Sequence, residues 1–102
     1  MARVKNMISN TTGRAIPNQF IITEYGQGSL GNFLHRETFQ SYNSIIVIVT
    51  TWADETRIEL DVDKWNYSKT TGRYRNQFLD ETRKETEVKI KSGEYKLTKL
   101  NQ

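Results

Sequence analysis

The segment from residue 65 to residue 79 holds the side chains best suited to binding chemistry in this chain of 102 residues. It interleaves the cations Lys69, Arg73 and Arg75 with aromatic, hydroxyl and amide side chains, the combination that contacts phosphates and stacks on bases. Ser68, Thr70 and Thr71 lie near a predicted helix N-terminus, where backbone N–H groups would bind an anion. We expect the three cations to contact nucleic acid or an acidic protein surface. The helical spacing of the aromatic residues favours a place in the core for them.

Charge is unevenly distributed around this segment, although the net charge is only +3. Residues 54–63 carry five acids against one arginine, residues 64–75 carry four cations and no acid, and residues 1–14 carry three cations and no acid. Either the adjacent blocks pair within the fold, or they form surfaces for a charged partner. The candidate partner-binding acidic face comprises Asp54, Glu55, Glu59, Asp61 and Asp63. The candidate basic face, for nucleic acid or a protein partner, comprises Lys64, Lys69, Arg73, Arg75, Arg3, Lys5 and Arg14.

Catalytic chemistry has little support, because the chain has no cysteine and a single histidine, His35. No serine lies in the G-x-S-x-G pattern of a nucleophile elbow. Glu59, Asp61 and Asp63 alternate along one predicted strand and would offer oxygen ligands to a divalent cation. Glu87-Val88-Lys89 matches the E-x-K fragment of metal-dependent nucleases, but it lies in a helix-like stretch. We therefore expect a protein that is not an enzyme, without catalytic residues, metal or cofactor, and keep a metal-dependent nuclease as a remote alternative.

Hydrophobic patterning predicts the strands that position these residues. Alternation and β-branched residues favour four of them, over residues 18–25, 32–40, 45–52 and 56–62. The apolar run at 45–49 is typical of a strand buried on both faces, with a short helix over 42–49 as the alternative. In the last strand, alternation points Asp61 outward and Val62 inward. The spacing of Gly26, Gly28 and Gly31 is explained by a turn rather than by a nucleotide-binding loop.

Helical spacing begins after residue 63. Tyr67, Thr71, Tyr74 and Phe78 share one face of a predicted helix, and Ser68 is one of three candidate N-caps, with Thr70 and Thr71. A second helix ends before Gly93, and residues 95–98 form a short closing strand. The sequence therefore predicts an α+β fold: a small antiparallel β-sheet of about four strands, followed by one or two C-terminal helices.

The expected organisation is a flexible polar N-terminal arm over residues 1–15 and a single domain over residues 16–102. No stretch has the apolar length of a membrane span, and no signal-like segment follows Met1. The absence of cysteine fits a reducing compartment. We expect a cytoplasmic protein that has no membrane partner and is a monomer or a homodimer.

Several stretches spread over about half of the chain also resemble a group of short proteins of phages and mobile elements in gut bacteria. They are residues 17–22, 39–46, 65–79, 84–87 and 91–97. The group has no assigned activity, so the resemblance transfers no catalytic residues. The resemblance implies a protein of a phage or mobile element. Small single-domain proteins of this kind often act by binding a protein complex of the host, and some of them are anti-CRISPR proteins.

Together these observations favour a non-enzymatic phage or mobile-element protein that inhibits a host defence nucleoprotein, such as a CRISPR–Cas effector. It would act in the cytoplasm of the host bacterial cell by blocking a nucleic-acid- or guide-binding surface. The expected partner is thus a host protein or nucleoprotein complex. The alternative is a DNA- or RNA-binding accessory protein of a phage, in which the basic residues contact phosphates directly.

Overall fold

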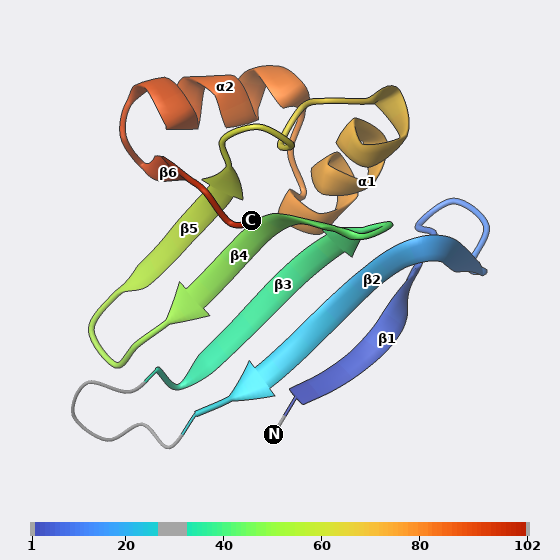
Figure 1. Ribbon diagram of the computed structural model, residues 1–102, viewed down its shortest axis with the longest axis horizontal. Coiled ribbons are helices and arrows are strands. Elements are labelled where there is room, and N and C mark those ends of the chain that lie inside the picture. Colours follow the sequence, from blue (N-terminus) through green and yellow to red (C-terminus); the bar gives the residue numbers. More distant parts are fainter. Residues whose placement is uncertain (1, 27–32, 102) are drawn as a thin grey trace.

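The computed structural model describes residues 2–26 and 33–101 of the chain. Its elements follow one another as shown in Figure 1. They are β1 (Ala2–Ile8), β2 (Ala15–Tyr25), β3 (His35–Ser41), β4 (Ser44–Thr51), β5 (Thr56–Asp61), α1 (Lys69–Leu79), α2 (Arg83–Lys91) and β6 (Tyr95–Thr98). The predicted loop glycines Gly28 and Gly31, and the predicted strand start at Asn32, lie outside the described residues.

The six strands form one sheet in the order β1-β2-β3-β4-β5-β6. The first five pair antiparallel with their neighbours, and β6 pairs parallel to β5. The parallel pair arises because the chain crosses over through both helices before it returns to the sheet. The predicted α+β fold is confirmed, with two helices and with six strands instead of about four.

A row of apolar side chains crosses the sheet on the face that the helices cover. Ile21, Phe39, Val47 and Leu60 occupy partner positions on β2 to β5, and the last three are fully buried. Phe78 of α1 stacks on Phe39 with ring centroids 5.7 Å apart. Burial of such large apolar side chains is the main stabilising contribution to a small domain.

Both helices lie at the same end of the sheet, close to where β3 and β5 end (Figure 1). Trp65, Tyr74 and Phe78 pack against the core, as their helical spacing predicts. Tyr67 does not, since 45% of its surface is exposed. One aromatic residue of the basic segment is thus left at the surface.

The predicted flexible arm is instead the edge strand β1 and its turn into β2. Residues 2–6 pair with residues 20–24 of β2, and Met7 is buried in the core. The sequence did not predict this strand because its other side chains are exposed and half of them are polar. Arg3 and Lys5 interrupt the apolar pattern by which a strand is predicted. On an edge strand, such charges discourage pairing with other chains.

β4 settles the alternative left open above, and β5 corrects one expectation. Residues 45–49 belong to strand β4, so the helix over residues 42–49 is wrong. At the end of β5 the predicted alternation fails: Asp61 is 1% exposed, whereas Val62 lies beyond the strand and is 45% exposed. The reason is that the C-terminal segment folds over Asp61, as described below.

The helix ends follow the signals in the sequence. Ser68 caps α1, and its side chain accepts a hydrogen bond from the Thr71 N–H at 3.1 Å. Thr82 and Glu85 form a reciprocal capping box at the start of α2. Gly93 follows α2 with φ +85°, a conformation that favours glycine after a helix.

Candidate basic cleft

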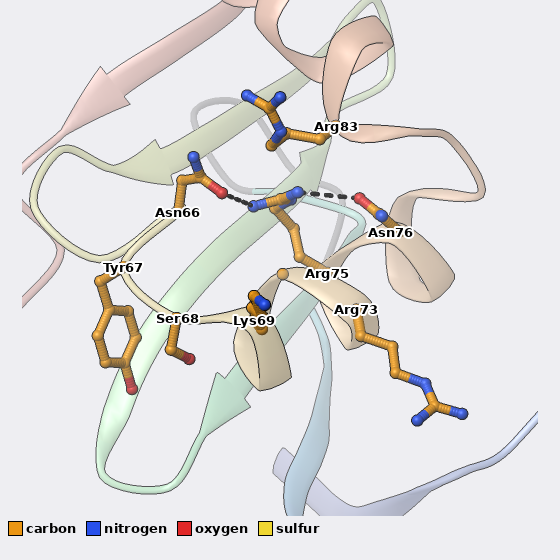
Figure 2. Close-up of a pocket in the computed structure, with 9 residues that line it drawn as sticks. Asn66, Tyr67, Ser68, Lys69, Arg73, Arg75, Asn76 and Arg83 are labelled. Carbon is orange, nitrogen blue, oxygen red and sulfur yellow. Dashed lines mark hydrogen bonds between the residues drawn. The ribbon is translucent and has the colours of Figure 1, made fainter.

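A cleft of about 620 Å³ lies where the loop after β5 meets α1 and the start of α2. Figure 2 shows cationic side chains approaching it from both helices. We call it the basic cleft and define it by its lining residues: Asn66, Tyr67, Ser68, Lys69, Gly72, Arg73, Arg75, Asn76 and Arg83. Four of these nine are Lys or Arg and none is acidic. Such a lining attracts anions and focuses a positive potential on the cleft.

Arg75 is the buried member of the cleft, with only 1% of its surface exposed. Its Nη1 donates to the Trp65 carbonyl at 2.5 Å and to Asn66 Oδ1 at 3.2 Å, and its Nη2 donates to Asn76 Oδ1 at 2.9 Å. The guanidinium also lies 5.2 Å from the centroid of the Trp65 ring, which adds a cation–π attraction. These contacts hold the guanidinium between the two asparagines (Figure 2).

The environment of Arg75 disfavours its positive charge. Burial lowers the pKa of the guanidinium, the nearby charge of Arg83 lowers it further, and Glu81 acts in the opposite direction. An arginine nonetheless stays protonated in proteins, because its unperturbed pKa lies far above neutral pH. The cleft therefore contains a permanent, poorly solvated cation beside a second arginine.

The N-terminal turn of α1 adds to this positive field. The helix begins in the cleft lining, at Ser68 and Lys69, and its first turn contains no acidic residue. The unpaired N–H groups of a first helical turn carry the positive end of the helix dipole. At the mouth of the cleft lies the half-exposed Tyr67, with the Lys64 Nζ 4.9 Å from its ring centroid.

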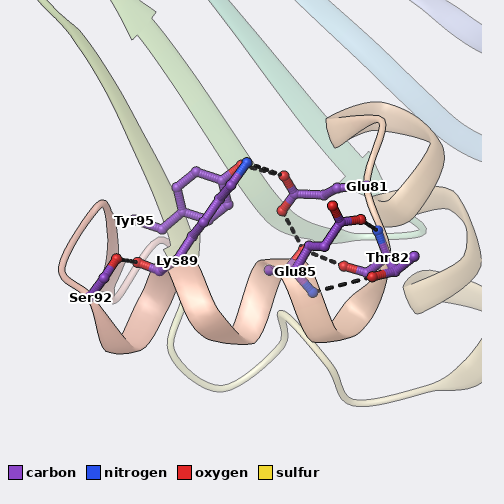
Figure 3. A network of polar contacts seen from close by, with 7 residues as sticks. Glu81, Thr82, Glu85, Lys89, Ser92 and Tyr95 are labelled. Atoms are coloured by element: carbon purple, nitrogen blue, oxygen red, sulfur yellow. Dashed lines mark hydrogen bonds and ion pairs between the residues drawn. The ribbon is translucent and has the colours of Figure 1, made fainter.

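Arg83 enters the cleft from the first position of α2, and a polar network fixes the start of this helix (Figure 3). Glu81 Oε1 accepts hydrogen bonds from Lys89 Nζ and the Tyr95 hydroxyl, both at 2.8 Å, and its Oε2 accepts one from Thr86 at 2.6 Å. Burial alone would raise the pKa of Glu81, but these donors outweigh it and lower the pKa. In Tyr95, burial and the hydrogen bond to Glu81 raise the pKa to about 12.

The predicted basic residues divide between the cleft and the rest of the molecule. Lys69, Arg73 and Arg75 line the cleft together, and Lys64 is adjacent through Tyr67. The other three predicted cations are elsewhere, on β1 and in its turn into β2: Arg3, Lys5 and Arg14.

The sequence reasoning missed Arg83. It belongs to a different helix from Lys69, Arg73 and Arg75, and it stands in a mixed-charge stretch. The one available signal was its position directly after the capping residue Thr82, which makes Arg83 the first residue of the helix.

The predicted acidic face is divided among separate places. Asp54 and Glu55 are exposed in the turn between β4 and β5, and Glu55 pairs with Arg57 at 3.8 Å. Glu59 is half-buried on β5, on the opposite sheet face from Leu60. Asp63 is exposed in the turn after β5, at the other end of the strand from Asp54. The structure does not gather these carboxylates into one surface.

Asp61, the fifth predicted acidic residue, holds two chain segments together. Its Oδ2 accepts hydrogen bonds from the N–H groups of Asp63 and Lys64 at 3.2 and 2.9 Å. Its Oδ1 accepts from those of Leu100 and Asn101 at 2.8 and 3.3 Å. Burial alone would raise the pKa of Asp61, but the backbone donors, with Leu100 first, bring it below the ordinary value of 3.8.

No ion pair joins residues 54–63 to residues 64–75 within the described part of the chain. Among residues 2–26 and 33–101, no three or more His, Cys, Asp or Glu side chains gather as a metal-binding group. Of the carboxylates considered above for a nuclease, Asp61 is engaged by backbone N–H groups and Glu87 pairs with Arg83 at 3.3 Å. None of the helices described has the length and apolar character needed to cross a membrane.

Comparison with known proteins gives a family but no activity. No curated protein and no solved structure matches the chain. Residues 3–95 match a family described as "Family of unknown function (DUF8033)", a span that runs from β1 to the first residue of β6 and includes the whole basic cleft. Because this match covers most of the chain, the protein belongs to this family of unknown function.

Proposed function

We propose that this protein is a non-enzymatic binding module that takes single-stranded DNA or RNA into the basic cleft. The observation that supports it most is that Lys69, Arg73, Arg75 and Arg83 all line one cleft, whose lining contains no acidic residue. Phosphate contacts by lysine and arginine supply most of the affinity in sequence-independent nucleic-acid binding.

Single strands suit the cleft better than duplex. Tyr67 stands half-exposed in the lining, beside the cations, and offers a face on which an unpaired base stacks. The cleft volume of about 620 Å³ is in the range of small-ligand sites, enough for one or two nucleotides rather than for a helix. A base on Tyr67 would place its phosphates next to the start of α1.

The guide strand of a host defence nucleoprotein, such as a CRISPR–Cas effector, is the target that the resemblance to phage and mobile-element proteins favours. In that form the protein inhibits the effector by covering nucleic acid that the effector needs. The half-exposed Tyr67 and the four cations are the surface that would contact the guide. A phage accessory protein that binds free DNA or RNA would use the same cleft.

The direct test is fluorescence anisotropy with a labelled oligothymidine and a matching duplex, over a series of salt concentrations. If the cations of the cleft neutralise the two phosphates that one or two nucleotides bring into it, the slope of log K against log salt for the single strand is about −1.4. The variant Lys69→Gln/Arg73→Gln/Arg83→Gln leaves one of these cations, so we expect its slope to fall to about −0.7.

The matched control is Arg3→Gln/Lys5→Gln/Arg14→Gln, which removes the same charge from β1 and its turn. We expect this control to keep the slope of the unmodified protein. An equal loss in both variants would mean that net charge, not the cleft, drives binding. No binding of the single strand at low salt would refute the proposed function.

The proposal that the target is a guide strand is tested by affinity capture from lysate. The tagged protein is expected to retain a host nucleoprotein from lysate of an infected or CRISPR-bearing bacterium, and the triple cleft variant is expected to lose it. Retention of the same complex by both proteins would contradict a role for the cleft in recognising a guide.

A further inference from the structure

A buried charge without an acidic partner lies in the basic cleft. All three acceptors around the Arg75 guanidinium are neutral: one backbone carbonyl and two amide oxygens. In the described part of the chain, no carboxylate lies within 4 Å of it. A guanidinium has five N–H donors, so these contacts leave donors unmatched, among them the buried Nε. A buried cation of this kind is unfavourable until an anion completes its environment.

The positive charges around Arg75 favour a ligand that carries more than one negative charge. Lys69, Arg73 and Arg83 line the same cleft, and the first turn of α1 adds its own partial positive charge. The Ser68 side chain is already occupied by the Thr71 N–H, so the free donors of this turn lie earlier, at Lys69 and Thr70. An internal phosphodiester carries one negative charge, whereas a phosphate monoester carries about −1.5 to −2 near neutral pH.

We propose that the basic cleft contains a subsite for the terminal phosphate monoester of a nucleotide, bound by the Arg75 guanidinium and the N-terminal turn of α1. This inference rests on the proposed function and refines it: the ligand is a strand end that carries a phosphate, or a free nucleotide. The three terminal oxygens of a monoester match donors from the guanidinium, the helix turn and Lys69. Tyr67 then stacks on the base of the same nucleotide.

The substitution Gly72→Ala tests this subsite. Gly72 lies in α1 and in the cleft lining, and a Cβ there would be 3.7 Å from both Nη1 and Nη2 of Arg75. That distance is an ordinary van der Waals contact, so the methyl group of alanine fits without displacing the arginine. It would instead occupy the space over the guanidinium that the phosphate needs.

The experiment compares strand ends in competition. Unlabelled ten-nucleotide oligothymidines with a 5′-phosphate, with a 3′-phosphate or with hydroxyls at both ends displace a labelled hydroxyl-ended tracer. We expect one of the phosphorylated strands to bind about tenfold more tightly than the hydroxyl-ended strand, as one charge-assisted contact allows. Titration with thymidine 5′-monophosphate and with thymidine, followed by calorimetry, distinguishes a free nucleotide from a strand end.

The outcomes separate the subsite from the proposed function. If the tracer binds and all three strands compete equally, the terminal-phosphate subsite is refuted and single-strand binding stands. If no strand binds but thymidine 5′-monophosphate does, the subsite stands and single-strand binding is refuted. In Gly72→Ala, which keeps every charge, we expect the tenfold preference to disappear. A preference that persists in this variant overturns the assignment to Arg75 and α1.

Discussion

The substitution Asp61→Asn tests how the C-terminal segment and the turn after β5 are fixed to the sheet. Each carboxylate oxygen of Asp61 accepts two backbone N–H groups, and the side chain is 1% exposed. Asparagine has one oxygen and one NH₂ group, so in either orientation one pair of N–H groups faces a donor. Two N–H groups then lose their acceptor, at about 1–3 kcal/mol each. We expect a loss of about 2–6 kcal/mol in the free energy of unfolding.

The assay is urea unfolding followed by tryptophan fluorescence, since Trp65 packs against the core. Asp63→Asn is the matched control, because it makes the same chemical change in the adjacent turn on an exposed residue. We expect the control to change the free energy of unfolding by less than about 0.5 kcal/mol. If Asp61→Asn costs less than about 1 kcal/mol at pH 7, the reasoning is refuted.

The effect of Asp61→Asn also has a defined pH dependence. Because the pKa of Asp61 is lower in the folded protein than its ordinary value of 3.8, the carboxylate contributes stability above that value. This contribution declines as the pH falls from about 4 through the folded pKa. The difference between the unmodified protein and Asp61→Asn is therefore expected to shrink in acid, and a difference that grows instead would contradict the assigned role.

Three further outcomes are expected. Thr82→Ala removes half of the capping box of α2 and is expected to lower the free energy of unfolding by about 1 kcal/mol in urea titrations, with a loss near zero contradicting the cap. Gly72→Ala replaces a helical glycine without a clash and is expected to raise the unfolding free energy by about 0.5–1 kcal/mol, whereas destabilisation would show that Arg75 has to move. Tyr95 is expected to ionise near pH 12 in an absorbance titration, so its hydrogen bond stabilises the fold at pH below 10 and this stability declines as the pH rises toward 12; Glu81→Gln, which removes the carboxylate, is expected to bring the tyrosine pKa down.

The parts of the fold that follow local patterns were predictable. The apolar run of β4, the N-cap Ser68 and the glycine after α2 each lie at the position that the sequence indicates. These features depend on side-chain periodicity and on backbone groups a few residues apart. β1 was not predictable in this way, because it pairs with β2 through the backbone while all of its side chains except that of Met7 are exposed.

The candidate site was predictable only in part, for a physical reason. Lys69, Arg73 and Arg75 lie within seven residues of one another and share a helix, so their sequence positions already suggest a common surface. Arg83 joins them through the packing of α2 beside α1, which no local pattern reports. The alternation of β5 predicts an exposed Asp61, but the residue is buried. Two of the N–H groups that bind its carboxylate come from residues 39 and 40 positions further along the chain, which a local pattern does not report.

The central claim is that the basic cleft is the nucleic-acid-binding surface, and an NMR titration of the ¹⁵N-labelled protein with oligothymidine tests it most directly. We expect the largest amide shifts within residues 66–76 and at Arg83. Amides of β1 and of the turn around Asp54 are expected to stay nearly unchanged. Largest shifts on β1 or in that turn, with residues 66–76 unaffected, would contradict the account.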